Sequence, residues 1–336
     1  MLKRVLIVVC VVVLITLLAQ TLTTQAITPT PAPSKTPTLS PTPTTAPVTA
    51  TATSVPEPAT NSSFEPFSQT DLSVLSGNVQ RPNGIVWLND KLYVACNGDW
   101  SIYEIEADSG ATELYIFGLR NAHTLFAEND DRGELNLWAP DFERNVLVRI
   151  TRTGFSTITT ELNGPWGIAY LDESSFLVTN LLDDNIVRVT REGQVSEFLT
   201  GLRSPTGIVI DGEFVYVANN GSARRGIEWS MNSPETNVGS PAETLVSGLQ
   251  NTTGLVMGSD GYLYFAYSLG TRGVVGRVDP VQCRENGGCT NDQVEIIVYS
   301  DLAAPLAGLA ISPDLQLFVH TIYRPEIYSV QLDQRP

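Results

Sequence analysis

The sequence predicts an all-β fold, a six-bladed β-propeller of four-stranded antiparallel blades. A short junction motif occurs six times and ends on an Ile or Leu at positions 85, 125, 168, 208, 255 and 309, with spacings of 40, 43, 40, 47 and 54 residues. A β-rich segment follows each junction, as in LYVAC (92–96) and FLVTN (176–180). Further apolar segments such as VLVRI (146–150) complete units of roughly 45 residues, the length of one propeller blade.

The ring is predicted to close through its N-terminal strand. The last unit stops at Leu332 after three strands, whereas the first strand, residues 72–75, precedes the first unit. Pairing of this strand with the last unit would complete the sixth blade and remove an exposed sheet edge. The alternative, two separate β-sandwiches, does not explain six copies of one junction.

Residues 1–26 are predicted to be a signal peptide or an N-terminal membrane anchor. Lys3 and Arg4 precede an apolar run over residues 5–19, which fits a secretory segment better than a membrane span of roughly 20 residues. Small residues around Ala26 predict cleavage there, and an uncleaved anchor is the alternative. We therefore expect an extracytoplasmic protein, either secreted or tethered to the membrane or cell wall through its N-terminus.

Residues 27–63 are predicted to form a disordered Thr/Pro-rich stalk. Residues 27–60 contain 9 prolines and 11 threonines and have no apolar face, so burial cannot offset the entropy of ordering them. Proline keeps such a segment extended, and we expect it to hold the propeller, residues 64–336, away from a wall or membrane.

The charge of residues 64–336 limits the class of partner. This part of the chain has 17 Lys and Arg residues against 35 Asp and Glu residues, a net charge of -18. Such a surface repels phosphate backbones, so no nucleic-acid partner is expected. Lys91 is the only lysine there, which argues against Schiff-base chemistry and against a P-loop phosphate site.

The candidate ligand-binding residues come from two sets of positions on one face, the top face, where the junction loops and the loops after the second strands meet. The residues before the junction glycine or its equivalent are Asn83, His123, Trp166, Thr206, Thr253 and Ala307. The ends of the second strands add Cys96, Pro140, Asn180, Asn219, Tyr267 and Thr321. Amides, hydroxyls, an imidazole and aromatic rings suit a small polar ligand. The alternative is that these residues cap the channel and bond to each other or to trapped water.

The top loops also carry eight arginines against six acidic residues, which predicts a weakly positive face on an acidic domain. Arg81 and Arg203 are therefore candidates for binding an anionic ligand. The alternative is that the loop arginines are solvated and paired with neighbouring acids.

Cysteines and oxygen ligands give two further expectations. Cys283 and Cys289 flank a five-residue segment with two glycines and are expected to form a disulfide after export, leaving Cys96 as a buried free thiol. No cofactor is assigned. The alternative is a calcium ion in the central channel, for which the candidate ligands are Asn83, Asp141, Asn180 and Asn219.

The Pro-x-Gly-Ile junctions at 82–85, 165–168 and 205–208, followed by strands such as VYVANNGS (215–222), resemble those of NHL-type and related six-bladed propellers. These include the regucalcin/gluconolactonase family, strictosidine-synthase-like proteins and virginiamycin B lyase, and the resemblance covers about residues 70–333. The resemblance to gluconolactonase-like enzymes implies a metal held partly by a Glu of the first blade, and this chain has Asn83 at that position. The resemblance to the lyase implies catalytic histidines in the ring. Only His123 matches such a position, because His320 is one residue before the ring position of its blade.

Two functions are therefore predicted. The first is an exported, stalk-displayed propeller whose top face binds a small polar or anionic ligand or an extracellular protein. The second is a lactonase-type hydrolase or lyase with Asn83, His123, Asn180 and Asn219 lining its site and His123 as the candidate catalytic base.

Overall fold

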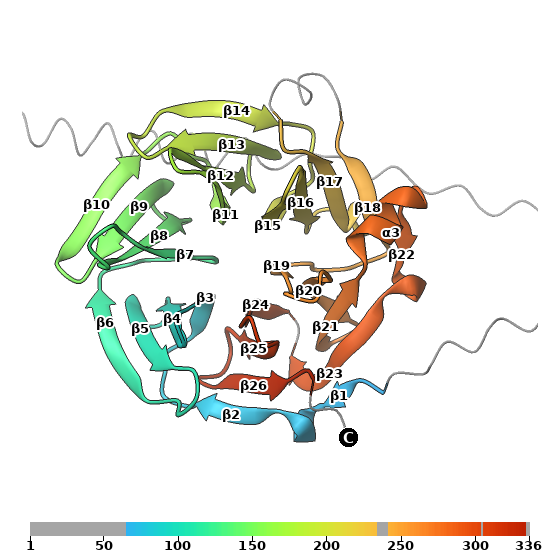
Figure 1. Ribbon diagram of the computed structural model, residues 1–336, viewed down its shortest axis with the longest axis horizontal. Helices are drawn as coiled ribbons and strands as arrows, with labels where there is room; N and C mark the ends of the chain where they lie inside the picture. Colours follow the sequence, from blue (N-terminus) through green and yellow to red (C-terminus); the bar gives the residue numbers. More distant parts are fainter. Residues whose placement is uncertain (1–64, 234–240, 304, 334–336) are drawn as a thin grey trace, which may run out of the picture. The chain divides into compact units, whose positions relative to one another are not determined.

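The computed structural model describes residues 65–233, 241–303 and 305–333. In this part of the chain the strands form six sheets of four or five strands, arranged as blades around a central axis (Figure 1). The structure thus confirms the six-bladed propeller. The predicted leader (1–26) and stalk (27–63) lie outside the described residues.

Each blade is built from antiparallel strands, and in blades 1 to 5 these strands run in sequence order from the axis outward. Blade 1 contains β3 (Pro82–Leu88), β4 (Lys91–Cys96), β5 (Ser101–Glu106) and β6 (Thr112–Phe117). Blade 2 contains β7 (Phe126–Asn129), β8 (Leu135–Asp141), β9 (Val146–Thr151) and β10 (Gly154–Thr159). Blade 3 contains β11 (Pro165–Asp172), β12 (Ser175–Asn180), β13 (Asn185–Thr190) and β14 (Val195–Leu199).

The second half of the ring repeats this arrangement. Blade 4 contains β15 (Pro205–Asp211), β16 (Phe214–Asn219), β17 (Ile227–Met231) and β18 (Glu243–Ser247). Blade 5 contains β19 (Leu255–Met257), β20 (Leu263–Leu269), β21 (Arg272–Val278) and β23 (Glu295–Ala303). Blade 6 contains β24 (Leu306–Ile311), β25 (Gln316–Thr321) and β26 (Ile327–Gln331), with β2 (Ser73–Ser76) as its outer strand.

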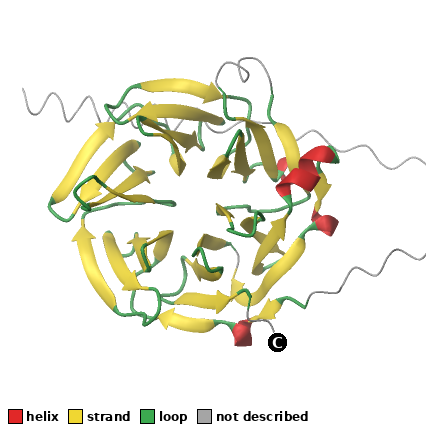
Figure 2. Cartoon of the chain, viewed as in Figure 1, coloured by secondary structure: helices red, strands yellow, loops and turns green. Residues whose placement is uncertain are grey.

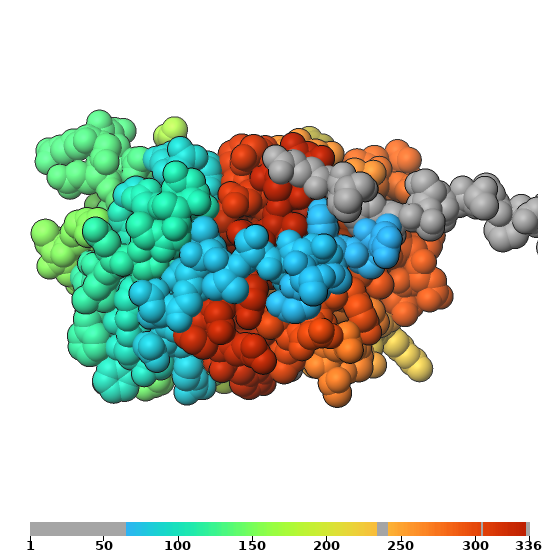
Figure 3. Space-filling view, turned by 90° about the horizontal axis from the view of Figure 1, so that it is seen from below, coloured from blue at the N-terminus to red at the C-terminus, as the bar shows by residue number. Residues whose placement is uncertain are grey.

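The ring closes as predicted, through the N-terminal strand. β2 pairs antiparallel with β26, with Val74 opposite Tyr328, and it lies one residue later than the expected range of 72–75. In the space-filling view the N-terminal residues (blue) lie across the C-terminal ones (red) at the rim of the disc (Figure 3). The two ends of the propeller domain therefore meet in one sheet.

Two blades carry a fifth strand. β1 (Phe67–Ser68) pairs parallel with β23, and β22 (Cys289–Thr290) pairs parallel with β18. β22 belongs to an insert between β21 and β23 that also contains α3 (Pro280–Glu285), so this insert links blade 5 to blade 4 (Figure 2). Short 3₁₀ helices lie at 69–71, 223–225 and 291–293. No helix in the described part of the chain has the length and apolar character needed to span a membrane.

The predicted disulfide is present in this insert. Cys283 in α3 is bonded to Cys289 in β22. Gly287 and Gly288 between them have φ angles of 72° and 109°, a backbone conformation that glycine adopts without a steric penalty. Cys96 is a buried free thiol, as predicted, and burial raises its pKa.

The core lies in the seams between neighbouring blades, where the faces of adjacent sheets pack together. Tyr216 and Phe265, both without solvent exposure, belong to one cluster that joins blades 4 and 5. Ile102 and Leu137 likewise belong to a cluster that joins blades 1 and 2. Burial of each such side chain stabilises the fold by roughly 1.5–3 kcal/mol, so stability is spread around the ring.

The junction glycines are needed because the inner ends of neighbouring blades approach closely. A Cβ atom on Gly167 would lie 2.3 Å from the Thr206 carbonyl oxygen, and one on Gly207 would lie 2.5 Å from the Thr253 carbonyl oxygen. Blade 2 has Thr124 at this position, and its hydroxyl donates to the Trp166 carbonyl oxygen at 2.8 Å. Close contact between backbones at the axis thus accounts for the Pro-x-Gly-Ile repeat.

Candidate functional site

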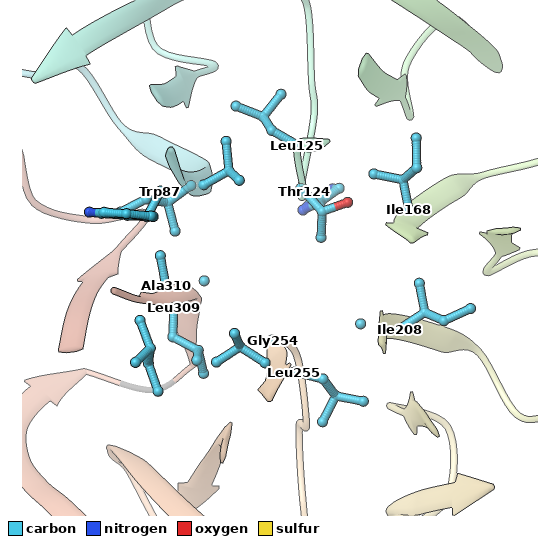
Figure 4. Close-up of a pocket in the computed structure, with 16 residues that line it drawn as sticks. Trp87, Thr124, Leu125, Ile168, Ile208, Gly254, Leu255, Leu309 and Ala310 are labelled. Atoms are coloured by element: carbon cyan, nitrogen blue, oxygen red, sulfur yellow. The ribbon is translucent and has the colours of Figure 1, made fainter. Parts of the chain in front are cut away.

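The innermost strands enclose a cavity of about 180 Å³ on the propeller axis. Its wall contains the side chain that ends the junction motif in each blade, and Figure 4 shows five of these residues around the opening. This set of aliphatic residues, the apolar ring, consists of Ile85, Leu125, Ile168, Ile208, Leu255 and Leu309. The repeated position that defines the blade spacing in the sequence is therefore the position that makes the channel apolar.

His123 contributes an imidazole to the same cavity. It lies in the loop before β7 and stacks on Trp166 at the start of β11, with ring centroids 3.4 Å apart and an angle of 8° between the planes. Phe142, in the turn between β8 and β9, meets His123 edge-on at 5.5 Å. These three rings, the mouth cluster, come from blades 2 and 3 and lie at the top of the channel.

The charge state of His123 follows from its surroundings. Burial lowers its pKa to about 3, because a charged imidazolium would lose hydration there without gaining a partner. Its contacts among the described residues are with aromatic rings, and its ring nitrogens make no hydrogen bond to them. At neutral pH this half-buried imidazole is uncharged, with one N–H donor and one nitrogen acceptor available to the cavity.

The hydroxyl groups predicted to face a ligand bind neighbouring blades instead. Thr206 Oγ1 donates to the Thr252 carbonyl oxygen at 2.8 Å, and Thr253 Oγ1 donates to the Leu306 carbonyl oxygen at 2.8 Å. Both threonines are buried and neither lines the axial cavity. These two positions agree with the alternative interpretation, in which ring residues bond within the protein.

The predicted second-strand residues hold the junction loops in place. The side-chain oxygen of Asn180 accepts from the backbone N–H of Asn163 at 3.2 Å, and that of Asn219 accepts from the backbone N–H of Arg203 at 2.9 Å. Asn219 also donates to the buried carboxylate of Glu228 at 2.8 Å. Both asparagines are therefore part of the scaffold of the top face and do not line the cavity.

The four candidates for a calcium site make hydrogen bonds within the protein. The Asp141 carboxylate accepts from the backbone N–H groups of Arg120 and Arg144, both at 3.2 Å, and Asn83 donates its amide to Asn121 Oδ1 at 2.7 Å. The oxygens of Asn180 and Asn219 are engaged as described above. Among the described residues, no three His, Cys, Asp or Glu side chains are grouped to hold a metal ion.

Two predicted ring positions were wrong by one residue. In blade 2 the residue that pairs with the junction loop is Asp141, opposite Ala122, whereas Pro140 had been predicted. In blade 5 the contact to the junction loop comes from Ser268, whose hydroxyl accepts from the Asn251 amide at 3.2 Å. Tyr267 instead packs in the core between blades 4 and 5, where burial raises its pKa to about 12.

The two candidate arginines lie on the surface of the top face, outside the axial cavity. Arg203 is exposed and its Nη1 lies 3.7 Å from Asp184 Oδ2, which agrees with the alternative of paired loop arginines. Arg81 is also exposed, with a φ angle of 54°. No charged side chain lines the cavity in the described part of the chain. The geometry therefore favours an uncharged ligand over an anionic one at the axis.

Sequence reasoning missed Phe142 and Thr124 as members of the site. The signal for Phe142 is its place directly after Asp141, the true end of the second strand, which puts an aromatic ring on the top face beside His123. The signal for Thr124 is that it replaces the junction glycine in blade 2. His320 in β25 is fully buried, and burial lowers its pKa to about 4.

Solved structures provide the comparison with known proteins, because no protein-family model and no curated protein matches the chain. A streptogramin B lyase matches 77% of this chain and 95% of its own, with a TM-score of 0.52 and 17% identity. The virginiamycin B lyase of Staphylococcus aureus matches 77% of this chain and 98% of its own, with a TM-score of 0.51 and 15% identity.

A gluconolactonase of Xanthomonas campestris matches 78% of this chain and 89% of its own, with a TM-score of 0.57 and 13% identity. Identities this low establish a shared fold and say nothing about the activity of this chain. The chain is therefore a six-bladed β-propeller related in fold to the lyase-type and lactonase-type propellers.

Proposed function

We propose that this protein is an exported, stalk-displayed binding propeller that holds a small uncharged polar ligand at the top of its axial channel. The observation that carries this proposal is His123, a neutral imidazole whose nitrogens have no partner in the described residues and which lines the axial cavity. A polar group in such a position is usually satisfied by hydrogen bonding, so a ligand or water is its expected partner.

The surroundings of His123 indicate what kind of ligand would fit. The mouth cluster offers flat aromatic surface, and the apolar ring offers aliphatic contacts deeper in the channel. The cavity volume of about 180 Å³ is below the ~300–1,000 Å³ typical of pockets for drug-sized ligands. We therefore expect either a very small molecule or a larger one that inserts only a flat or aliphatic end.

Export is supported by two features. The N-terminal sequence has the basic start, apolar run and small residues of a secretory segment, followed by the Thr/Pro-rich stalk. The Cys283–Cys289 disulfide is typical of an oxidising compartment outside the cytoplasm.

The alternative is a lactonase-type hydrolase or lyase with His123 as general base. It is favoured by the fold shared with a gluconolactonase and two lyases. A general base works best with a pKa near the operating pH, and the low pKa of His123 makes it a weak proton acceptor. We therefore rank this function second.

The two functions are separated by testing binding and turnover on the full chain. A panel of uncharged sugars, lactones, lactams and nucleosides is screened by ligand-observed NMR. The key variant is His123→Phe, which keeps a flat ring against Trp166 but removes both nitrogens. Tyr323→Ala is the control, because it removes a 60% exposed aromatic ring from the same face.

We expect at least one compound to bind the wild type and the control but not His123→Phe. Absence of binding, or binding that survives His123→Phe, would contradict the proposal. Glucono-δ-lactone hydrolysis is measured in parallel with added Ca²⁺ and Zn²⁺. Turnover that the His123→Phe variant lacks would establish the enzymatic alternative.

A further inference from the structure

A second and larger hollow lies between blades 2 and 3, on the face opposite the junction loops. Its volume is about 570 Å³, within the range of ~300–1,000 Å³ typical of ligand pockets. We call it the seam groove. It shares no lining residue with the axial cavity. Its lining consists of Glu128, Asn129, Asp130, Asp131, Asn136, Trp138, Arg149, Ser156, Ile158, Tyr170, Glu173 and Arg191.

One side of the seam groove is held in place by a partly buried ion pair. Arg191 Nη2 binds Glu128 Oε2 at 2.9 Å, and Trp138 Nε1 donates to Glu128 Oε1 at 2.8 Å. The Arg191 guanidinium also lies 4.9 Å from the centroid of the Trp138 ring. These charges neutralise each other, so this part of the groove is a fixed wall joining the two blades.

Tyr170 gives the groove an accessible aromatic surface. Its side chain is 40% exposed although it belongs to an innermost strand, β11. The ring is stacked on Phe126 at 5.6 Å and meets Phe176 edge-on at 6.5 Å. Because two aromatic neighbours fix its orientation, the exposed part of the ring is a preformed platform for a flat apolar face.

The polar groups around this platform include donors and acceptors whose hydrogen-bonding capacity is unused within the described residues. Arg149 engages only its Nε, which donates to Asn136 Oδ1 at 2.7 Å, and its terminal nitrogens make no ion pair there. The side chains of Asn129, Asp131 and Glu173 are exposed and make no hydrogen bond or ion pair to the described residues. The groove therefore presents amide, carboxylate and guanidinium groups together.

This combination fits hydroxyl groups better than charges. A hydroxyl donates to a carboxylate and accepts from a guanidinium, whereas a cationic peptide would meet Arg149 and an anionic uronate would meet Asp131 and Glu173. A pyranose ring carries such hydroxyls around its edge and an apolar C–H face that packs on an aromatic ring. We propose that the seam groove binds a neutral oligosaccharide, with one sugar ring resting on Tyr170.

Isothermal titration calorimetry on the full chain tests this proposal with four probes: cellotetraose and chitotetraose as neutral sugars, tetragalacturonate as an anion and tetralysine as a cation. Tyr170→Ala removes the platform, and Tyr170→Phe keeps it. Tyr299→Ala is the matched control, because Tyr299 is 39% exposed but lies on blade 5.

We expect a neutral tetrasaccharide to bind the wild type, with about tenfold weaker binding by Tyr170→Ala, an effect of roughly the size of one ring-stacking contact. Tyr170→Phe and Tyr299→Ala should bind as the wild type does. The proposal is overturned if neither neutral sugar binds, if Tyr170→Ala has no effect, or if only tetragalacturonate or tetralysine binds. His123→Phe should leave sugar binding at the seam groove unchanged. Failure of the ligand proposal for the axial cavity can therefore be distinguished from failure of the oligosaccharide proposal for the groove.

Discussion

Substitution of Gly207 by alanine should open the seam between blades 4 and 5 at the axis. Gly207 lies in β15, where the inner end of blade 4 meets blade 5 (Figure 1). A Cβ atom there would lie 2.5 Å from the Thr253 carbonyl oxygen and 2.8 Å from the Leu255 nitrogen. Both neighbours are backbone atoms, so the added methyl group can be accommodated only if the two blades move apart.

The expected cost comes from strain and from lost hydrogen bonds. Overpacking in a tight interior costs typically about 1–3 kcal/mol. The Gly207 N–H donates to the Thr253 carbonyl oxygen at 2.9 Å, and this bond crosses the same seam and would lengthen, at a cost of about 1 kcal/mol. The lower entropy of an unfolded chain with alanine offsets roughly 0.4–1 kcal/mol of this. We therefore expect the free energy of unfolding to fall by about 1–3.5 kcal/mol.

Denaturation by urea, followed by tryptophan fluorescence, measures this change. Gly77→Ala is the control, because a Cβ on Gly77 would have no atom within 4 Å and its backbone has no positive φ. The control should leave the free energy of unfolding unchanged or raise it by up to about 1 kcal/mol. If Gly207→Ala is within about 0.5 kcal/mol of Gly77→Ala, close packing at the axis does not explain the junction glycines.

Three further predictions concern stability. Replacing both Cys283 and Cys289 by serine should lower the free energy of unfolding by about 2–3 kcal/mol, because the disulfide closes a loop with a sequence separation of 6; an unchanged urea midpoint would contradict this. Thr253→Val should lower the free energy of unfolding by about 1–2 kcal/mol, because the Leu306 carbonyl loses the hydroxyl that donates to it. Thr157→Val, at an exposed position, is the control and should leave the urea midpoint unchanged. Burial lowers the pKa of His320 from 6.5 to about 4, so the unfolded chain binds the proton more tightly. The contribution of neutral His320 to the free energy of unfolding is complete above pH 6.5 and should fall by about 3 kcal/mol as the pH drops to about 4. The prediction is refuted if the His320→Asn variant loses as much stability to urea between pH 7 and pH 4 as the wild type does.

The fold was predictable from sequence because its repeat is local and regular. The same junction residue, for example Ile168 or Ile208, packs at the same place in each blade, so the spacing of these residues reports the blade length. The closing strand was predictable because three strands in the last unit leave an incomplete sheet. The disulfide was predictable because Cys283 and Cys289 are close in sequence.

The direction of the ring side chains was harder to predict. The pairing shifts register between Pro82 and Gly84 and between Pro205 and Ile208, so the innermost strands are irregular where the candidate residues lie. Such irregularities re-aim side chains, and Thr206 is turned toward the next blade. A shift of one residue likewise exchanged Tyr267 for Ser268, because alternate residues of a strand face opposite sides.

The mouth cluster and the seam groove could not be read from sequence for a different reason. His123 and Trp166 are in different blades, and so are Asn136 and Tyr170, which line one groove. Their contacts depend on the distance and angle between neighbouring blades. These quantities are set by packing in the seams and leave no periodic signal in the chain.

The pKa of His123 decides most directly between a binding site and a catalytic one. The protein has two histidines, so the imidazole carbon signals of both can be followed by NMR from pH 8 to pH 3 on the full chain, with His123→Phe as the assignment variant. We predict that the His123 signal stays at its neutral position down to about pH 4, in line with a pKa of about 3. Titration of that signal near pH 6.5 would contradict the account, because His123 would then be a hydrated base available for catalysis.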